Sequence, residues 1–265
     1  AISQMVSMVP EGLPVAMTIA LAVGMQRMAA RGAIIRRLSA VETLGSTTVI
    51  CSDKTGTLTR NEMTAVALWL PGGGGSRTIT VDGIGYAPQG RLHEAGRDVG
   101  SDDPALHELL CAALLCNDAE LLPPEDERSA WQVLGDPTEG ALLVLAAKAG
   151  LDLAGCRRAA PREAELPFDS DTKLMATRHR SAEAPRRVFV KGAPEAVLRL
   201  GPPADAATAH AARAQAESMA TQALRVLAFA VVDDDGLDAA TGFDALAGRA
   251  RLLGLVGQID PPREE

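Results

Sequence analysis

The sequence predicts an α/β protein, and three kinds of stretch carry that prediction. Residues 47–50 are a short run of Thr, Val and Ile, which is typical of a buried strand and leads to Asp53. Helix starts of the form Asp-Pro occur at Asp103 and Asp136, among further strand-like apolar runs. Residues 1–25 are almost wholly apolar. We therefore expect one transmembrane helix, then part of an α/β domain that is interrupted by an inserted α+β domain.

Composition limits the classes of function. The chain has 265 residues and a net charge of −8, and it has no basic stripe with aromatic side chains, so we expect no nucleic-acid partner. Aromatic residues make up only 3% of the chain, so Ala, Val and Leu must fill the core. The four cysteines show no CxxC spacing, which favours free thiols over a zinc site, and the four histidines are scattered.

The N-terminal apolar stretch is long enough to cross a membrane. At ~1.5 Å per residue, a helix over residues 1–25 would span a hydrocarbon core of ~30 Å. It lacks the basic start of a signal peptide, and its positive charge follows it instead. These charges place the carboxyl-terminal end of the helix in the cytoplasm; they are Arg27, Arg31, Arg36 and Arg37.

Residues 10–14 read Pro-Glu-Gly-Leu-Pro, a poor sequence for a regular helix. Two prolines and a glycine would unwind a spanning helix and free backbone carbonyls. A carboxylate such as Glu11 is costly at membrane depth unless it pairs with a cation or a proton. Freed carbonyls and Glu11 together predict a site for a hard cation. A kinked helix with a protonated Glu11, or the buried helix of a soluble protein, is the alternative.

The segment from Asp53 to Thr59 predicts a phosphoryl-accepting loop. Asp53 follows the carboxyl end of the predicted strand, where ligand crevices form in open α/β sheets. Gly56 permits a tight turn, and the hydroxyls and N–H groups of Thr55, Thr57 and Thr59 could surround a phosphate. The Asp53 carboxylate could then act as a nucleophile towards the γ-phosphoryl group of ATP. A Thr-rich turn after a strand is the alternative.

Three stretches in the second half of the chain contain candidate binding residues. Glu139 comes three residues after the helix start at Asp136, which by local pattern indicates a capping box. Phe168 is followed five residues later by Lys173, and a core aromatic with a surface lysine is the default reading. Residues 187–190 form a strand that leads to Lys191 and Gly192. This glycine would let a ligand approach, whereas the alternative is a surface lysine at a strand end.

Local patterns predict several further elements. Residues 78–81 alternate like an edge strand, and residues 83–100 are expected to be loop. An Ala-rich helix is expected over residues 206–223, and strands over residues 224–230 and 252–259.

Residues 53–59 resemble the phosphorylation motif of P-type ATPases, ion pumps whose catalytic domain has a haloacid-dehalogenase-like fold. Residues 10–14 are similar to the fourth transmembrane helix of calcium-pump-like members, and residues 191–195 resemble their nucleotide-site lysine motif. The resemblance implies that the transported cation binds Glu11 and the carbonyls of Val6, Ser7 and Val9. Ca²⁺ is favoured, while Na⁺, Mn²⁺ and H⁺ remain open.

The resemblance also implies roles at the catalytic and nucleotide sites. Asp53 would be the nucleophile, Lys54 would offset developing charge, and Mg²⁺ would bridge Asp53, the Thr55 carbonyl and phosphate oxygens. Glu139 would accept from the adenine amino group. The other nucleotide-binding residues implied are Phe168, Lys173, Met175, Lys191, Gly192 and Arg225. Ser170 stands where several relatives have an arginine, so the resemblance does not carry over one phosphate contact.

These inferences give a domain plan and a function. Residues 1–30 are the transmembrane helix, 31–63 the first part of the phosphorylation domain, 64–257 the nucleotide-binding domain, and 258–265 the return to the phosphorylation domain. The chain is expected to be an incomplete piece of a pump that drives cations across a membrane with ATP. Its expected partners are ATP, the cation, membrane lipid and the remaining parts of the pump.

Two other functions are compatible with these motifs. The first is a nucleotide-binding module without turnover. The second is a dehalogenase-type phosphatase, which is disfavoured because Thr55 stands where those enzymes carry a second aspartate.

Overall fold

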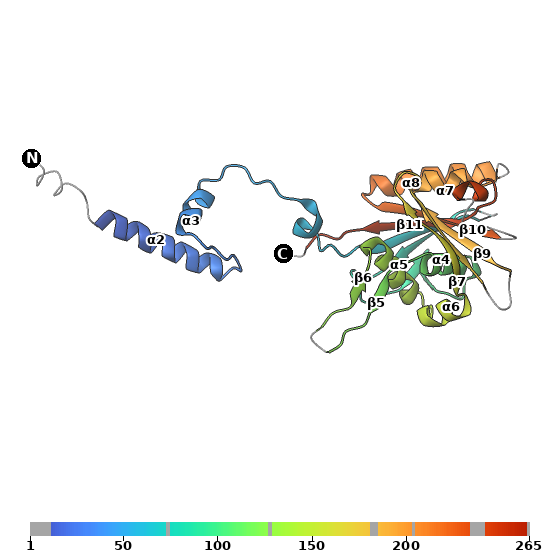
Figure 1. The fold of residues 1–265 in the computed structure, drawn as a ribbon, viewed down its shortest axis with the longest axis horizontal. Helices are drawn as coiled ribbons and strands as arrows, with labels where there is room; N and C mark the ends of the chain where they lie inside the picture. Colours follow the sequence, from blue (N-terminus) through green and yellow to red (C-terminus); the bar gives the residue numbers. More distant parts are fainter. Residues whose placement is uncertain are drawn as a thin grey trace, which may run out of the picture. The chain divides into compact units, whose positions relative to one another are not determined.

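A computed structural model describes residues 12–72, 75–126, 129–180, 185–202, 205–233 and 242–263. The chain divides into two compact units, Ala1–Asp53 and Lys54–Glu265. Figure 1 shows the ribbon of both units, with the elements labelled.

The first unit contains two helices, α2 (Gly12–Ala29) and α3 (Leu38–Gly45). Helix α2 has 18 residues, is apolar and is long enough to cross a membrane, and none of its residues is buried. Helix α2 ends at Ala29, and Gly32 adopts a φ of 80° in the turn that follows it. The first two residues of the motif at residues 10–14, Pro10 and Glu11, lie outside the described residues. The other expected cation ligands also lie outside them: Val6, Ser7 and Val9.

The strand predicted over residues 47–50 is not formed. Val49 is 72% exposed and Ile50 is 88% exposed. An apolar β-branched run becomes a strand only when a neighbouring strand accepts and donates its ladder of hydrogen bonds. Residues 47–50 pair with none of the strands that the structure describes, so local propensity alone did not suffice.

The second unit is built on a nine-stranded sheet with the order β4-β3-β2-β1-β11-β10-β9-β8-β7. All of its strand pairs are antiparallel. The strands expected over residues 187–190, 224–230 and 252–259 are confirmed as β9, β10 and β11. The bounds are β1 Thr64–Leu70, β2 Arg77–Val81, β3 Leu92–Glu94, β4 Arg97–Val99, β7 Arg162–Asp169, β8 Leu174–His179, β9 Arg187–Gly192, β10 Arg225–Asp233 and β11 Arg251–Ile259.

Two expectations about the beginning of this sheet are wrong. Strand β2, expected at an edge, lies between β1 and β3. The reason is that the region expected to be loop contributes β3 and β4, each of three residues, which extend the sheet beyond β2. Strands this short carry too little periodic pattern to be recognised in a sequence.

Helices cover both faces of the sheet (Figure 1). One face carries α4 (Pro104–Leu115), α5 (Pro137–Lys148) and α6 (Leu153–Ala159), and the other carries α7 (Pro194–Arg199) and α8 (Ala206–Thr221). The predicted helix starts are confirmed, because Asp103 accepts from the N–H of Leu106 and Asp136 accepts from that of Thr138. A separate hairpin pairs β5 (Glu120–Leu122) with β6 (Gln132–Leu134). Short helical turns cover Lys54–Leu58 and Phe243–Leu246.

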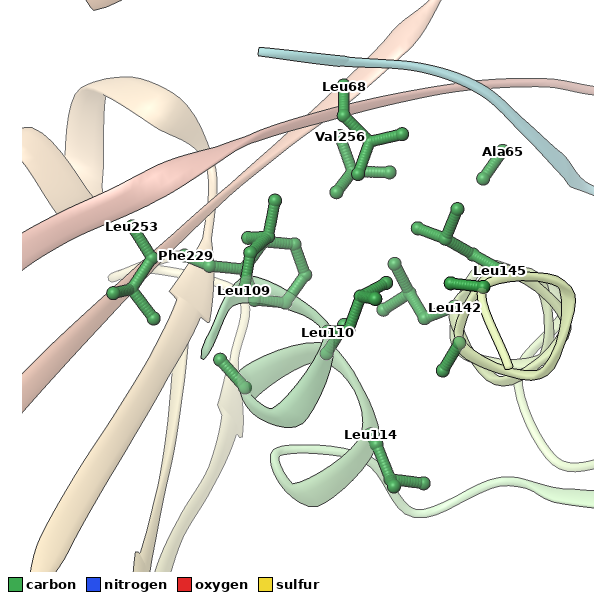
Figure 2. Packing of buried hydrophobic residues seen from close by; sticks show 14 of the residues in the cluster. Ala65, Leu68, Leu109, Leu110, Leu114, Leu142, Leu145, Phe229, Leu253 and Val256 are labelled. Carbon is green, nitrogen blue, oxygen red and sulfur yellow. The ribbon is translucent and has the colours of Figure 1, made fainter. Parts of the chain in front are cut away.

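Alternation along the strands divides the apolar side chains between two clusters. In β1, Leu68 packs in the cluster with α4 and α5, whereas its neighbour Trp69 packs in the cluster with α7 and α8. Figure 2 shows Leu109, Leu110, Leu142 and other leucines of α4 and α5 against Phe229 and Val256 of the sheet. Because this layer is densely packed, the end of α4 and the start of α5 are fixed relative to the sheet.

Candidate functional site

A cavity of about 650 Å³ lies in the second unit, where the start of α5 meets the ends of the central strands. It brings together six of the seven residues predicted for the nucleotide: Glu139, Phe168, Lys173, Lys191, Gly192 and Arg225. Its remaining lining residues are Asp118, Gly135, Asp136, Thr138, Ala193, Val226 and Leu227. Another cavity, of about 570 Å³ near the start of α4, contains none of the predicted residues.

A pair of opposite charges forms the inner wall of the cavity. The carboxylate of Glu139 is bonded through Oε1 to the ammonium of Lys191, and its Oε2 accepts from the N–H of Asp118 at 3.0 Å. The same ammonium donates to the carbonyl of Cys116 at 2.7 Å. The Lys191 and Glu139 side chains are only 7% and 14% exposed. This arrangement desolvates the pair and fixes the direction of the carboxylate.

The alternative interpretations of Glu139 as a capping-box residue and of Lys191 as a surface lysine are therefore wrong. Glu139 makes no capping box, because its side chain turns away to Lys191 and Asp118. The cap is supplied by Asp136, whose Oδ1 accepts from the N–H groups of Thr138 at 2.7 Å and Glu139 at 3.3 Å. Lys191 is not a surface lysine, since only 5% of the residue is exposed.

Phe168 and Lys173 flank the turn between β7 and β8. Phe168 is 61% exposed at the cavity, so the default reading of a core aromatic is wrong. The turn is closed by Asp169, whose Oδ1 accepts from the N–H groups of Asp171 and Thr172, both at 2.8 Å. These backbone hydrogen bonds hold the pKa of the Asp169 carboxyl below its usual value. Lys173 has its ammonium 3.4 Å from Glu195 and remains largely exposed.

Gly192 is required by a close approach of two backbone segments. A Cβ at this position would lie 2.2 Å from the carbonyl oxygen of Lys173. Any other residue would push β9 away from the turn before β8 and widen the cavity. The sequence predicted that a ligand comes close to Gly192. In this structure the group that comes close is the backbone carbonyl of Lys173.

Arg225, at the start of β10, contacts the first turn of α5. Its guanidinium donates through Nη1 to the hydroxyl of Thr138 at 3.2 Å, and the residue is exposed. Gln258, which faces Arg225 across the β10–β11 pair, donates to the carbonyl of the same threonine at 3.1 Å. Two neighbouring strands thus fix the first turn of α5.

Met175 is the predicted nucleotide residue that the structure does not bring to the cavity. It is 1% exposed and belongs to the apolar cluster of α4 and α5. Its carbonyl accepts from the thiol of Cys116 at 3.7 Å. Met175 lies on β8, where its side chain is covered by the helical layer of the core.

The segment after Asp53 is tied to the end of the chain that follows β11. The hydroxyl of Thr59 donates to the carboxylate of Asp260 at 2.5 Å. The N–H of Arg60 donates to Pro261 at 3.0 Å, and the guanidinium of Arg263 donates to Gly56 at 3.0 Å. The segments that lead into and out of the sheet therefore lie side by side.

Sequence reasoning missed three residues that line the cavity or hold the side chains of its wall. Asp118 and Cys116 contribute only backbone groups, which no residue-type motif identifies. In the sequence, Thr138 is recognisable only as part of a helix start. The polar pair Asn117-Asp118 directly after an apolar helix was the one available signal.

The described residues contain no group of three or more His, Cys, Asp or Glu side chains placed to hold a metal ion. The expected ligands of the transported cation lie outside them, and so does the side chain of Thr55. Asp53 closes the first unit, whereas every residue that lines the cavity belongs to the second. The assignment of Mg²⁺ to Asp53 and Thr55 stays a prediction.

Comparisons with known proteins point to one family. Residues 105–265 match the family model described as P-type ATPase, cytoplasmic domain N. The chain is 43% identical to the cation-transporting ATPase pma1 of Synechocystis, an alignment that covers 100% of this chain and 30% of the relative. It is 44% identical to a probable cation-transporting ATPase F of Mycobacterium tuberculosis, covering 99% of this chain and 29% of the relative.

A human relative, calcium-transporting ATPase type 2C member 1, is 37% identical over 99% of this chain and 27% of its own length. The chain thus spans about 30% of the length of the curated relatives that it matches. Together with the match to domain N, these identities show that the chain belongs to the P-type ATPase family.

Proposed function

We propose that this chain is the part of a cation-transporting P-type ATPase that binds ATP and carries the aspartate that is phosphorylated. The observation that carries the proposal is the meeting of Glu139, Lys191, Phe168 and Arg225 around one cavity of about 650 Å³. Such a volume suits a ligand of nucleotide size. The residues come from distant stretches of the sequence and offer an aromatic face, a fixed acceptor and a cation.

The cavity suggests how the nucleotide lies. The exposed ring of Phe168 offers a face on which adenine stacks. Glu139 is already held by Lys191 and by Asp118 N–H, but each of its oxygens keeps acceptor capacity for the adenine amino group. Arg225, which lines the same cavity and bonds the Thr138 hydroxyl, would bind phosphate oxygens. Lys173 adds positive charge at the rim.

Asp53 is the proposed acceptor of the γ-phosphoryl group. An oxygen of its carboxylate forms a bond to the γ-phosphorus, the bond from that phosphorus to the bridging oxygen breaks, and ADP leaves with the electron pair. Lys54 offsets the developing negative charge. Carboxylate and carbonyl oxygens such as those of Asp53 and Thr55 are donors that fit Mg²⁺, which would neutralise phosphate charge when bound.

Cation transport is proposed for the whole protein. The relatives' names specify cation or calcium transport, and helix α2 is apolar over 18 residues. Glu11 and the carbonyls of Val6, Ser7 and Val9 would supply hard oxygen ligands, which favours Ca²⁺. The protein would then lie in a membrane among lipids, with its catalytic domains in the cytoplasm. A nucleotide-binding module without turnover is the alternative, since the cavity is complete without Asp53.

The test of this proposal uses the full-length protein and radiolabelled ATP. We expect an acid-stable phosphoenzyme that disappears in Asp53→Asn, because the amide keeps the shape but is not a nucleophile. ATP binding should persist in that variant, and Asp98→Asn, a change on the distant strand β4, is the matched control. An Asp53→Asn protein that is still labelled would contradict the proposal. Labelling of neither protein despite ATP binding would support the non-catalytic alternative.

A second variant tests the membrane half of the proposal. Glu11→Gln removes a cation ligand without altering the nucleotide site. Phosphorylation should then lose its dependence on the transported cation, since the two sites communicate through a shift in conformational populations. Cation-dependent phosphorylation and transport that are unchanged in Glu11→Gln would show that residues 10–14 are not the ion site.

A further inference from the structure

The turn after α4 supplies the backbone groups that hold the charged pair of the cavity. The carbonyl of Cys116 accepts from the ammonium of Lys191, and the N–H of Asp118 donates to the carboxylate of Glu139. The direction of the Glu139 carboxylate therefore depends on the position of this turn. Asn117, between these two residues, does not line the cavity.

Asn117 ties the turn to both helices through its side chain. The residue is 3% exposed. Its amide nitrogen donates to the carbonyls of Ala113 in α4 at 3.1 Å and of Glu139 in α5 at 2.9 Å. Its amide oxygen accepts from the N–H of Ala119 at 2.9 Å. Both donor hydrogens and the acceptor of this buried amide are thus used.

Arg162, which does not line the cavity, bonds the same turn. From the first position of β7, its Nη2 donates to the carbonyls of Leu115 at 3.3 Å and Asn117 at 2.8 Å. Its Nη1 donates to the Asp118 carboxylate at 2.6 Å. A guanidinium that binds two carbonyls at the end of α4 also complements the negative end of the helix dipole.

We propose that Asn117 is a positioning residue for base recognition, with Arg162 as its support. The inference rests on the proposed function, since it concerns the adenine that Glu139 would bind. Asn117 bonds the backbone of Glu139 directly and fixes the turn that bonds its side chain. It therefore acts on the nucleotide only through Glu139.

Loss of the Asn117 side chain should change the selectivity between bases, and not only the affinity for the nucleotide. Without the Asn117 amide, the carbonyls of Ala113 and Glu139 lose a buried donor, and the turn must move to find new partners. The N–H of Asp118 then leaves the Glu139 carboxylate, which no longer points at the base. An amino group on the base loses its acceptor, whereas an oxo group at the same position loses nothing, so discrimination between the two falls.

The experiment compares ATP with inosine triphosphate, which carries an oxo group in place of the adenine amino group. Calorimetry with the 265-residue chain gives the ratio of the two affinities. We expect the ratio to favour ATP in the unsubstituted chain and to fall about tenfold in Asn117→Ala, as it should in Glu139→Ala. Arg162→Met should lower the ratio in the same direction. Arg186→Ala, which removes a bond to Glu163 at 2.8 Å, is the control and should leave it unchanged.

The outcomes distinguish a positioning role of Asn117 from a merely structural role. A ratio that is unchanged in Asn117→Ala, or equal losses of affinity for both nucleotides, would overturn the inference, because a merely structural residue affects both alike. If Asn117→Ala does not fold, the ratio in Arg162→Met decides in the same way. Binding of neither nucleotide by the unsubstituted chain would instead contradict the proposed function, on which the inference depends.

Discussion

Lys191, the fifth residue of strand β9, and Glu139, in the first turn of helix α5, form a largely buried ion pair at the wall of one cavity. Both ions have further partners, the Cys116 carbonyl and the Asp118 N–H. A desolvated pair is costly to build but very costly to break, because the remaining partner keeps an uncompensated charge. Stability and nucleotide binding are therefore linked at this pair.

The first prediction concerns the stability of this pair. Lys191→Met should lower the free energy of unfolding by about 3 kcal/mol, at the low end for a broken buried pair, since Glu139 is not wholly buried. Adding Glu139→Gln should restore part of the loss, as measured by urea denaturation in a double-mutant cycle. The control is Lys173→Met, which breaks an ion pair whose side chains are 58% and 57% exposed and should change stability little. Strictly additive effects of the two substitutions would contradict the coupling.

The second prediction separates an aromatic contact from packing. Phe168→Ala should weaken ATP binding by about 1–3 kcal/mol through loss of stacking, with little change in melting temperature. Leu134→Ala is the matched control, since Leu134 is also 61% exposed but lies outside the cavity. Equal ATP affinities for the two variants, measured by calorimetry, would remove Phe168 from the site.

The third prediction concerns Met175, which the resemblance assigned to the nucleotide. Because it is 1% exposed, Met175→Ala should lower the free energy of unfolding by about 2–5 kcal/mol. The affinity of the folded fraction for ATP should stay within about twofold of the unsubstituted value, since the side chain does not line the cavity. A large loss of affinity without a loss of stability would restore the original assignment.

The fourth prediction is a pH dependence. Burial lowers the pKa of His179, whose Nδ1 lies 2.9 Å from the carbonyl oxygen of Ala160. The unfolded chain thus binds a proton more readily, so stability is complete above about pH 6.5 and falls as the pH drops towards the lowered folded pKa. This fall should be absent in His179→Gln.

His93 provides the contrasting control for that measurement. Its hydrogen bond to Asp82 raises its pKa, so its contribution to stability is lost as the pH rises. The difference in stability between the unsubstituted chain and His93→Gln should therefore shrink with rising pH. Denaturation curves between about pH 5 and 8 that show the same trend for both histidines would contradict the burial of His179.

Local chemistry was enough to predict the capped helices and the longer strands. Asp103 and Asp136 each precede a proline and cap a helix as expected, because these side chains act within their own turn. The residue set of the cavity followed from motif resemblance, since Phe168, Lys191 and Arg225 belong to recognisable stretches.

Features that depend on distant partners were not predictable from local pattern. Glu139 fits a capping box by its spacing, and only the fold brings Lys191 close enough to compete for its side chain. Residues 47–50 have the composition of a strand but no described partner. Met175 shows that a place near a motif does not settle on which side of a strand a side chain lies.

A calorimetric titration of the 265-residue chain with ATP tests the central claim most directly. The account predicts binding at one site, weakened by about 1–3 kcal/mol in Lys191→Ala because Glu139 then loses its fixed direction. Arg251→Ala removes a bond to Glu108 at 2.8 Å outside the cavity and should bind ATP like the unsubstituted chain. No heat of binding in the unsubstituted chain, or equal affinities in it and in folded Lys191→Ala, would contradict the assignment of the cavity as the ATP site.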